Sequence, residues 1–280
     1  MAGTSSLKTP NLHEIRAYNL GAKLSKQLAS RHGAEPAEVL CFLQDDDVPM
    51  YPGALADFLS GAEAALIKFS PQRLAMVSGR AANLCNAELG ALPIDRPVEL
   101  LERRTGVTHP IPFAQPSGEP FMFVTEAWLA PLCVRRDAFE RLGGFDETFS
   151  RVGEPGVGVD INLALRTLRL NLTVGLMESR LVQGAGGHGT VSSEGKLRQR
   201  TRARDQNGLR NSEVTGCRHG RWPRDAVGRA MQLNNQLLKV REKMGCKHPS
   251  CAALWPRRFP NGHAQLVLNN LTSMCIAYAC

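Results

Sequence analysis

The sequence has few aromatic residues and no long apolar run. Phe, Trp and Tyr together make up 6% of 280 residues, and no apolar stretch approaches the roughly 20 residues that a membrane-spanning helix needs. Residues 1–16 lack the apolar core and small-residue cleavage site of a secretory signal. We therefore expect a soluble chain with no membrane span. It would be cytoplasmic or, if an upstream anchor precedes it, associated with the Golgi or another membrane.

Cysteine is also sparse. The chain has 8 cysteines, and their spacings show no repeated pair, which excludes a small disulfide scaffold. This pattern leaves the redox compartment open. The overall composition, 43% hydrophobic and 21% charged, is that of a globular protein with ample chain to bury a core.

Acidic residues are outnumbered by basic ones. The formal net charge is +8, which favours an anionic partner such as a sugar-nucleotide diphosphate, a nucleic acid or an anionic membrane surface. Residues 196–210 carry six Lys or Arg residues against the single Asp205. They show no interleaved aromatic residues and no nucleic-acid motif, so nucleic-acid binding is the weaker alternative.

Short apolar segments alternate with helical patterns up to about residue 176, which is typical of an α/β sheet domain. Residues 91–120 contain six prolines and are expected to be irregular. In the predicted helix at residues 160–170, one apolar face packs inward while Asn162, Arg166 and Arg169 face elsewhere. The expected strands are residues 39–43 (a buried parallel strand), 74–78 and 172–176, and the expected helices are residues 21–31, a helix following Pro52, a short helix N-capped by Asp137, residues 160–170 and residues 226–244.

Three consecutive aspartates, Asp45, Asp46 and Asp47, follow the first predicted strand. Like charges this close repel each other unless a cation neutralises them. Carboxylate oxygens suit Mg²⁺ or Mn²⁺, which also bridge substrate phosphates, and ligands of open α/β sheets bind beyond the carboxyl ends of strands. The cluster therefore predicts a metal and phosphate site, and the alternative is a solvated acidic turn that caps the next helix.

Three ordered segments resemble GT-A fold glycosyltransferases, especially family 2, across about residues 11–190. The first is LCFLQDDDVPMYPGAL, which is similar to the family's strand, DxD motif and following helix. The second is VRRDAFERLGGFDETF, followed by GVDINLALR, which resembles the GGFDE and ED.DL..R segments of the acceptor side. Asn19-Leu20-Gly21 resembles the N.G step one helix upstream.

The resemblance implies roles for individual residues on the donor side. Asp45 and Asp47 match the DxD pair that holds Mn²⁺ or Mg²⁺ and the donor diphosphate, with Asp46 between them. His188 resembles a late histidine that serves some GT-A enzymes as a further metal ligand, and its alternative is an exposed loop histidine. Two arginines of the basic run, Arg198 and Arg200, suit a lid that neutralises the diphosphate, because guanidinium pairs well with phosphate oxygens.

On the acceptor side, Asp160 matches the catalytic base of inverting members. The helix dipole favours a charged carboxylate at this position, and the alternative is that Asp160 only caps its helix. The wall of the acceptor pocket is matched by Trp128, Gly144, Phe145 and Asp146, although GGFDE is equally consistent with a helix stop and a packed Phe. The chain departs from the family pattern at Val159, where the family has Glu, and at Asn162, where it has a second Asp.

Family 2 domains begin with a βαβ half that grips the nucleotide, and the resemblance here starts after it. We therefore expect an N-terminally truncated, GT-A-like (Rossmann-like) mixed sheet flanked by helices at residues 11–190, followed by a basic, cysteine-containing helical extension at residues 191–280. The expected activity is sugar transfer from a nucleotide-diphosphate donor to a carbohydrate, lipid or protein acceptor. The alternatives are a catalytically silent binding domain and, less favoured, a nucleic-acid-binding protein.

Overall fold

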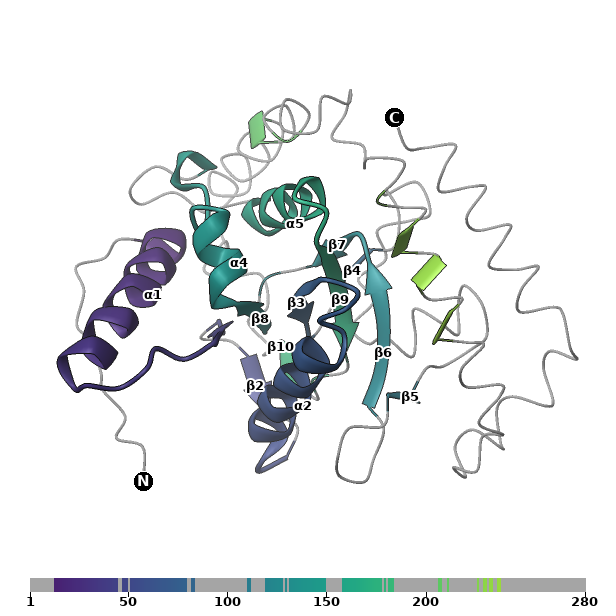
Figure 1. Cartoon of the computed structure of the whole chain (residues 1–280), viewed down its shortest axis with the longest axis horizontal. Helices are drawn as coiled ribbons and strands as arrows, with labels where there is room; N and C mark the ends of the chain where they lie inside the picture. The colour runs from purple at the N-terminus through teal and green to yellow at the C-terminus, as the bar shows by residue number, and fades with distance from the viewer. Residues whose placement is uncertain are drawn as a thin grey trace, which may run out of the picture.

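The computed structural model gives the protein an α/β architecture built on a mixed, open sheet (Figure 1). The helices are α1 (His13–Arg31), α2 (Ala54–Lys68), α4 (Arg136–Arg141) and α5 (Val159–Arg169), with a 3-10 turn η2 (Glu147–Phe149). The structure describes residues 13–44, 47–49, 51–79, 82–83, 110–111, 119–127, 129, 131–149, 158–177, 179, 181–183, 206–207, 211, 226, 229–230, 232–233 and 236–237.

The main sheet has six strands in the order β1-β8-β3-β9-β6-β5. Neighbouring strands pair antiparallel except for β3 and β9, which pair parallel. Two short ribbons, β2 with β10 and β4 with β7, accompany it. The strands are β1 (Val39–Phe42), β2 (Asp47–Pro49), β3 (Leu74–Ser78), β4 (Ala82–Asn83), β5 (Pro110–Ile111), β6 (Glu119–Val124), β7 (Glu126–Ala127), β8 (Leu132–Arg135), β9 (Thr173–Met177) and β10 (Leu181–Gln183).

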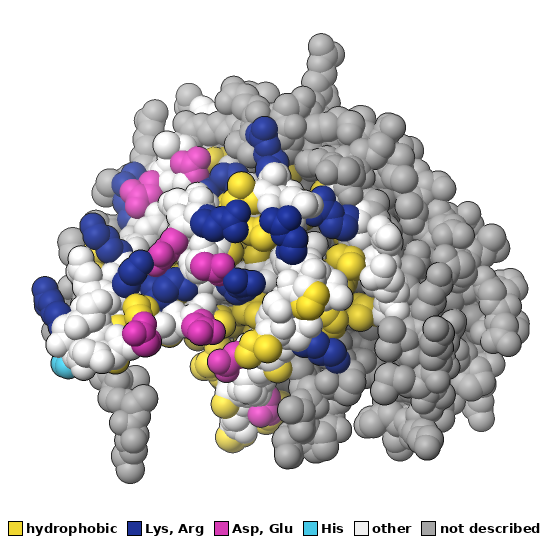
Figure 2. All heavy atoms as spheres, in the orientation of Figure 1, with side chains coloured by type: hydrophobic (Ala, Val, Ile, Leu, Met, Phe, Trp, Pro, Cys, Tyr) yellow, Lys and Arg dark blue, Asp and Glu magenta, His cyan; other side chains and the backbone are white. Residues whose placement is uncertain are grey.

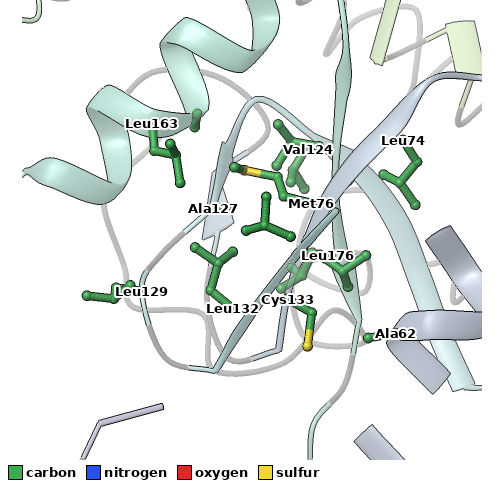
Figure 3. Close-up of a cluster of buried hydrophobic side chains, with 14 of the residues drawn as sticks. Ala62, Leu74, Met76, Val124, Ala127, Leu129, Leu132, Cys133, Leu163 and Leu176 are labelled. Atoms are coloured by element: carbon green, nitrogen blue, oxygen red, sulfur yellow. The ribbon is translucent and has the colours of Figure 1, made fainter. Parts of the chain in front are cut away.

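Both faces of the central strands are covered, because every residue of β3 and β9 is buried. One face carries Phe121 and Phe123 of β6, and Phe69 at the end of α2 stacks on Phe121 with ring centroids 4.9 Å apart. The other face receives α5, whose Leu163 points toward Met76 in the close-up of the core (Figure 3). The central strands are thus enclosed between α2 and α5.

An aromatic cluster continues the core toward α1. Phe42 of β1 contacts Phe145 and Phe139, with centroids 5.0 and 5.2 Å apart. Tyr18 of α1 packs on Phe42 at 5.2 Å and donates a hydrogen bond to the carbonyl of Leu43 at 2.7 Å. These rings attach α1 to the edge of the sheet.

A disulfide joins Cys41 and Cys133, which are directly opposite each other in β1 and β8. The two cysteines are separated by 92 residues in sequence, so the spacing pattern gave no indication of the pair. The bond fixes the edge strand β1 to β8 immediately before the predicted acidic motif.

Residues from the C-terminal extension contribute to this same core. Ala226 and Ala230 are buried in the main hydrophobic cluster, and Leu233 and Leu237 pack against it. The described residues of this segment are helical, in agreement with the predicted helix at residues 226–244. The division at residue 190 stays a prediction.

The sequence correctly predicted the strands at residues 39–43 and 74–78, with differences of at most one residue at the ends. The first is not a parallel strand in the middle of the sheet, however. It lies at the edge of the sheet and pairs antiparallel with β8, and Cys41 is exposed. An unbroken apolar run cannot distinguish these cases, because Cys41 supplies an apolar letter at an exposed position.

The prediction that Asp137 N-caps α4 was also wrong. The N-cap residue is Arg135, and Asp137 lies in the first helical turn. Its carboxylate accepts hydrogen bonds from the Arg135 side chain at 2.9 and 2.7 Å.

Within the described residues, no helix has both the length and the apolar character needed to cross a bilayer.

Gly175 of β9 is required by packing, because a Cβ there would lie 2.6 Å from the ring of Phe121. We predict that Gly175→Ala lowers the free energy of unfolding by about 1–3 kcal/mol through overpacking. Gly21→Ala on α1, where a Cβ meets nothing within 4 Å, should instead stabilise by about 0.5–1 kcal/mol. Urea denaturation of both variants measures this, and equal effects would contradict the packing argument.

Candidate functional site

Asp47 lies at the point where the chain leaves the main sheet. It is the first residue of β2, and its backbone pairs with Gln183 of β10. Its carboxylate Oδ2 accepts a hydrogen bond from the backbone N–H of Gln44 at 2.9 Å, which holds the side chain across the turn. Asp45 and Asp46 lie outside the described residues.

Asp160 is the second residue of α5. The N-cap position is Gly158, whose φ of 79° is left-handed and which offers no side chain to the helix. The Asp160 carboxylate accepts hydrogen bonds from the backbone N–H groups of Ile161 at 2.9 Å and Leu129 at 3.2 Å. It therefore satisfies a backbone donor of the first turn and also joins α5 to the segment that precedes β8.

The strand register puts Asp47 and Asp160 at the same end of the sheet. Leu132 opens β8 and pairs with Phe42, the last residue of β1, so Asp47 follows this end of β1. Leu129, which donates a hydrogen bond to Asp160, precedes Leu132 by three positions. The predicted metal ligand and the predicted base thus lie at the end of the sheet where β1 and β3 reach their C-termini. Open α/β sheets bind ligands at this end.

The Gly143-Gly144 pair ends α4 in a left-handed turn, with φ values of 74° and 75°. Gly144 N–H donates to the carbonyl of Phe139 at 2.9 Å, and Gly143 N–H donates to that of Glu140 at 3.0 Å. This is the Schellman arrangement, which satisfies the free carbonyls of the last helical turn. Gly144 has a second constraint, because a Cβ there would lie 2.6 Å from Oδ1 of Asn19.

Asn19 of α1 forms hydrogen bonds with both backbone polar groups of Phe145, the residue that follows this turn. Its Oδ1 accepts from the N–H of Phe145 at 2.9 Å, and its Nδ2 donates to the carbonyl of Phe145 at 2.8 Å. Nδ2 also donates to Oε1 of Glu147 at 3.0 Å. Two segments 126 residues apart in sequence are thereby joined through one amide side chain.

Arg166 connects the same turn to the helix that carries Asp160. Its guanidinium donates to the carbonyls of Leu142 and Gly144, the latter at 2.8 Å, and to Oδ1 of Asn162 at 2.7 Å. Burial lowers the pKa of Arg166, and the nearby Asp146 carboxylate acts in the opposite direction by favouring the charged form. An arginine stays charged under these conditions, so a half-buried cation organises the turn.

The expectation that Asn162 and Arg166 face away from the packed side of α5 was wrong for Asn162, which is 0% exposed. Its Nδ2 donates to Oδ1 of Asn211 at 3.2 Å, and Nδ2 of Asn207 donates to the carbonyl of Phe149 at 3.0 Å. The apolar pattern concealed this, since a buried amide and an exposed one look alike in sequence. No sequence signal pointed to Asn207 or Asn211.

The remaining predicted site residues are distributed as follows. Phe145 is 2% exposed and its ring belongs to the aromatic core, while Asp146 accepts hydrogen bonds from the N–H and hydroxyl of Thr148 at 2.9 and 2.7 Å. Within the described part of the chain, no three His, Cys, Asp or Glu side chains gather into a metal site. Trp128, His188, Arg198 and Arg200 lie outside that part, as do two of the three clustered aspartates.

No protein-family model matches this sequence, and the comparison with curated proteins finds no match either. The interpretation of the site therefore depends on its own residues and geometry.

Substitution of Asn19 tests the hydrogen bonds that join α1 to the turn after α4. Asn19→Ala leaves both backbone groups of Phe145 without their partner, and we predict a loss of about 1–3 kcal/mol in unfolding free energy. Gln27→Ala removes an exposed amide from the same helix and should change it by less than about 0.5 kcal/mol. Chemical denaturation compares the two, and an equally mild effect of Asn19→Ala would show that the contact contributes little.

Proposed function

We propose that the chain is a GT-A-like glycosyltransferase domain that transfers a sugar from a nucleotide-diphosphate donor to an acceptor hydroxyl. The observation that carries the proposal is the connection between Asp160 and the Gly143-Gly144 turn. Asn19, the turn and Arg166 form one hydrogen-bonded unit. They come from two of the three segments that resemble the family, and Arg166 lies on the helix of Asp160.

On the donor side, Asp47 would hold the divalent cation together with Asp45. The fit is chemical: carboxylates are the hard oxygen ligands that Mn²⁺ and Mg²⁺ prefer, and Asp47 lies beyond the end of a sheet strand. The cation supplies charge neutralisation for the departing diphosphate. Arg198 and Arg200 of the basic segment would pair with the same phosphate oxygens.

On the acceptor side, Asp160 is the proposed general base. It would accept the proton of the acceptor hydroxyl as that oxygen bonds to the anomeric carbon and the bond to the diphosphate breaks. Its position in the first turn of α5 favours the charged carboxylate, because the helix dipole is positive there. The Arg166 contacts keep α5 fixed against the turn, so the carboxylate does not have to be ordered when substrate binds.

The donor site is tested by thermal denaturation of the full chain with Mn²⁺ and a panel of UDP-, GDP- and dTDP-sugars. A donor at 100 times its Kd should stabilise the protein by about 2.7 kcal/mol. We predict that Asp47→Asn abolishes this metal-dependent stabilisation, while Glu63→Gln, on an exposed position of α2, retains it. Full stabilisation of the Asp47→Asn variant would refute the donor site, and binding without any transfer would favour the silent binding domain.

The base is tested separately by Asp160→Asn. The amide oxygen can still accept the Leu129 N–H, so the helix should remain in place, but it cannot take a proton. We predict unchanged donor-induced stabilisation and a transfer rate lower by about 10²–10⁴-fold. A rate within a few-fold of the unsubstituted chain would remove Asp160 from the mechanism.

A further inference from the structure

A small hollow lies at the other end of the sheet, away from Asp47 and Asp160. Its volume is about 160 Å³, and its rim carries Arg73, Arg135 and Arg141. Its lining also includes the buried apolar residues Ala138 and Leu172. Lys and Arg side chains gather on this side of the molecule, over α4 and α5 (Figure 2). We refer to this feature as the arginine hollow.

The arginines come from three separate elements. Arg73 directly precedes β3, Arg135 ends β8, and Arg141 ends α4. Guanidinium groups repel one another, so their convergence is unfavourable unless anions compensate it. One carboxylate does so in part: Asp137 binds Arg135 in a two-bonded ion pair at 2.9 and 2.7 Å. Two positive charges are left over.

Arg141 is the least satisfied of the three. It is exposed, and among the described residues it has neither an ion pair nor a hydrogen bond. Arg73 is held in place by one hydrogen bond, from its Nη2 to the carbonyl of Leu170 at 3.2 Å. The rim thus contains one fixed pair, one oriented guanidinium and one guanidinium that has no partner in the described part of the chain.

The backbone at Arg73 supports a role for its side chain. Its φ is 61°, in the left-handed region that arginine rarely adopts. Glycine would fit this conformation without strain, so an arginine here is kept at a conformational cost. The second non-glycine residue with positive φ in the described part, Asn171 at 58°, lies in the neighbouring turn before β9. Asn171 does not line the hollow, and asparagine tolerates this conformation better.

We propose that the arginine hollow binds a phosphate group. The excess of two positive charges matches a phosphate dianion, and guanidinium forks bind phosphate oxygens in pairs. The volume equals that of about five water molecules, which suits one phosphate with a small substituent rather than a nucleotide. The five residues of β3 separate the hollow from the end of the sheet near Asp47 by roughly 16 Å, at about 3.3 Å per residue. The hollow is therefore a second site.

The test is calorimetric titration of the full chain with inorganic phosphate at pH 8 and low ionic strength. We expect one phosphate per chain. Arg141→Gln should weaken binding roughly tenfold, whereas Asp137→Asn should tighten it roughly two- to fivefold, since it releases Arg135. The effects are opposite because one substitution removes a positive charge from the hollow and the other removes its negative charge, and an arginine far from the hollow controls for a general charge effect. Arg31→Gln, which removes an exposed charge from the end of α1, should leave the affinity unchanged.

A second pair of variants separates binding from folding. Arg73→Gly removes a rim charge at a position where glycine is favoured, so phosphate affinity should fall without loss of thermal stability. Asn171→Gly makes the same backbone change outside the hollow and should bind phosphate normally. The proposal is overturned if the unsubstituted chain binds no phosphate, if Arg31→Gln weakens binding as much as Arg141→Gln, or if Asp137→Asn fails to tighten it.

Two further arms identify the source of the phosphate. Glycerol phosphate represents a small soluble ligand, and vesicles of phosphatidylcholine with and without phosphatidic acid represent a lipid headgroup. Glycerol phosphate binding that Arg141→Gln weakens assigns the hollow to soluble phosphate esters. Sedimentation with phosphatidic acid vesicles that the same variant abolishes assigns it to lipid. Either result supports the proposal. If Arg141→Gln binds glycerol phosphate and sediments with phosphatidic acid vesicles as well as the unsubstituted chain does, the proposal is contradicted.

Discussion

Hydrogen bonding by the half-buried guanidinium of Arg166 is the interaction on which the predicted acceptor side depends. It binds two carbonyls of the turn after α4 from within α5, so two elements that are distant in sequence share one cation. Burying a charge is costly unless hydrogen bonds and an opposite charge compensate it, and here the carbonyls and Asp146 supply both. Removing Arg166 would take away the side-chain donor to the carbonyls of Leu142 and Gly144 and the direct link between α5 and the turn.

Asn19 completes this arrangement from the other side. A side-chain amide has a donor and an acceptor, so it can replace a β-strand neighbour and satisfy both backbone groups of Phe145. The contact requires Gly144, where any Cβ would collide with the amide oxygen. The glycine pair thus has two functions, since it ends α4 and also lets α1 approach.

Local sequence patterns predicted the positions of several strands. They did not predict strand direction, strand order or the burial of Asn162, because these depend on contacts between residues far apart in sequence. The apolar runs of β1 and β3 identified strands because their residues are buried on a pleated surface. Their direction and order depend on partners such as β8, which the chain reaches only after the proline-rich residues 91–120. Asn162 was misplaced for a related reason, because its partner Asn211 lies 49 residues further along the chain. Hydrogen bonds of this kind have no periodic signature.

The register of the β2–β10 ribbon bears on the metal prediction. Gln183 of β10 pairs with Asp47, the first residue of β2, and His188 follows Gln183 by five residues. Five residues span at most about 17 Å when fully extended, so the chain length allows an imidazole from residue 188 to reach a cation held by Asp47. The sequence alone could not establish this, because 141 residues separate Asp47 from His188. The β2–β10 pairing supplies the missing constraint, since it places Gln183, five residues before His188 in sequence, opposite Asp47.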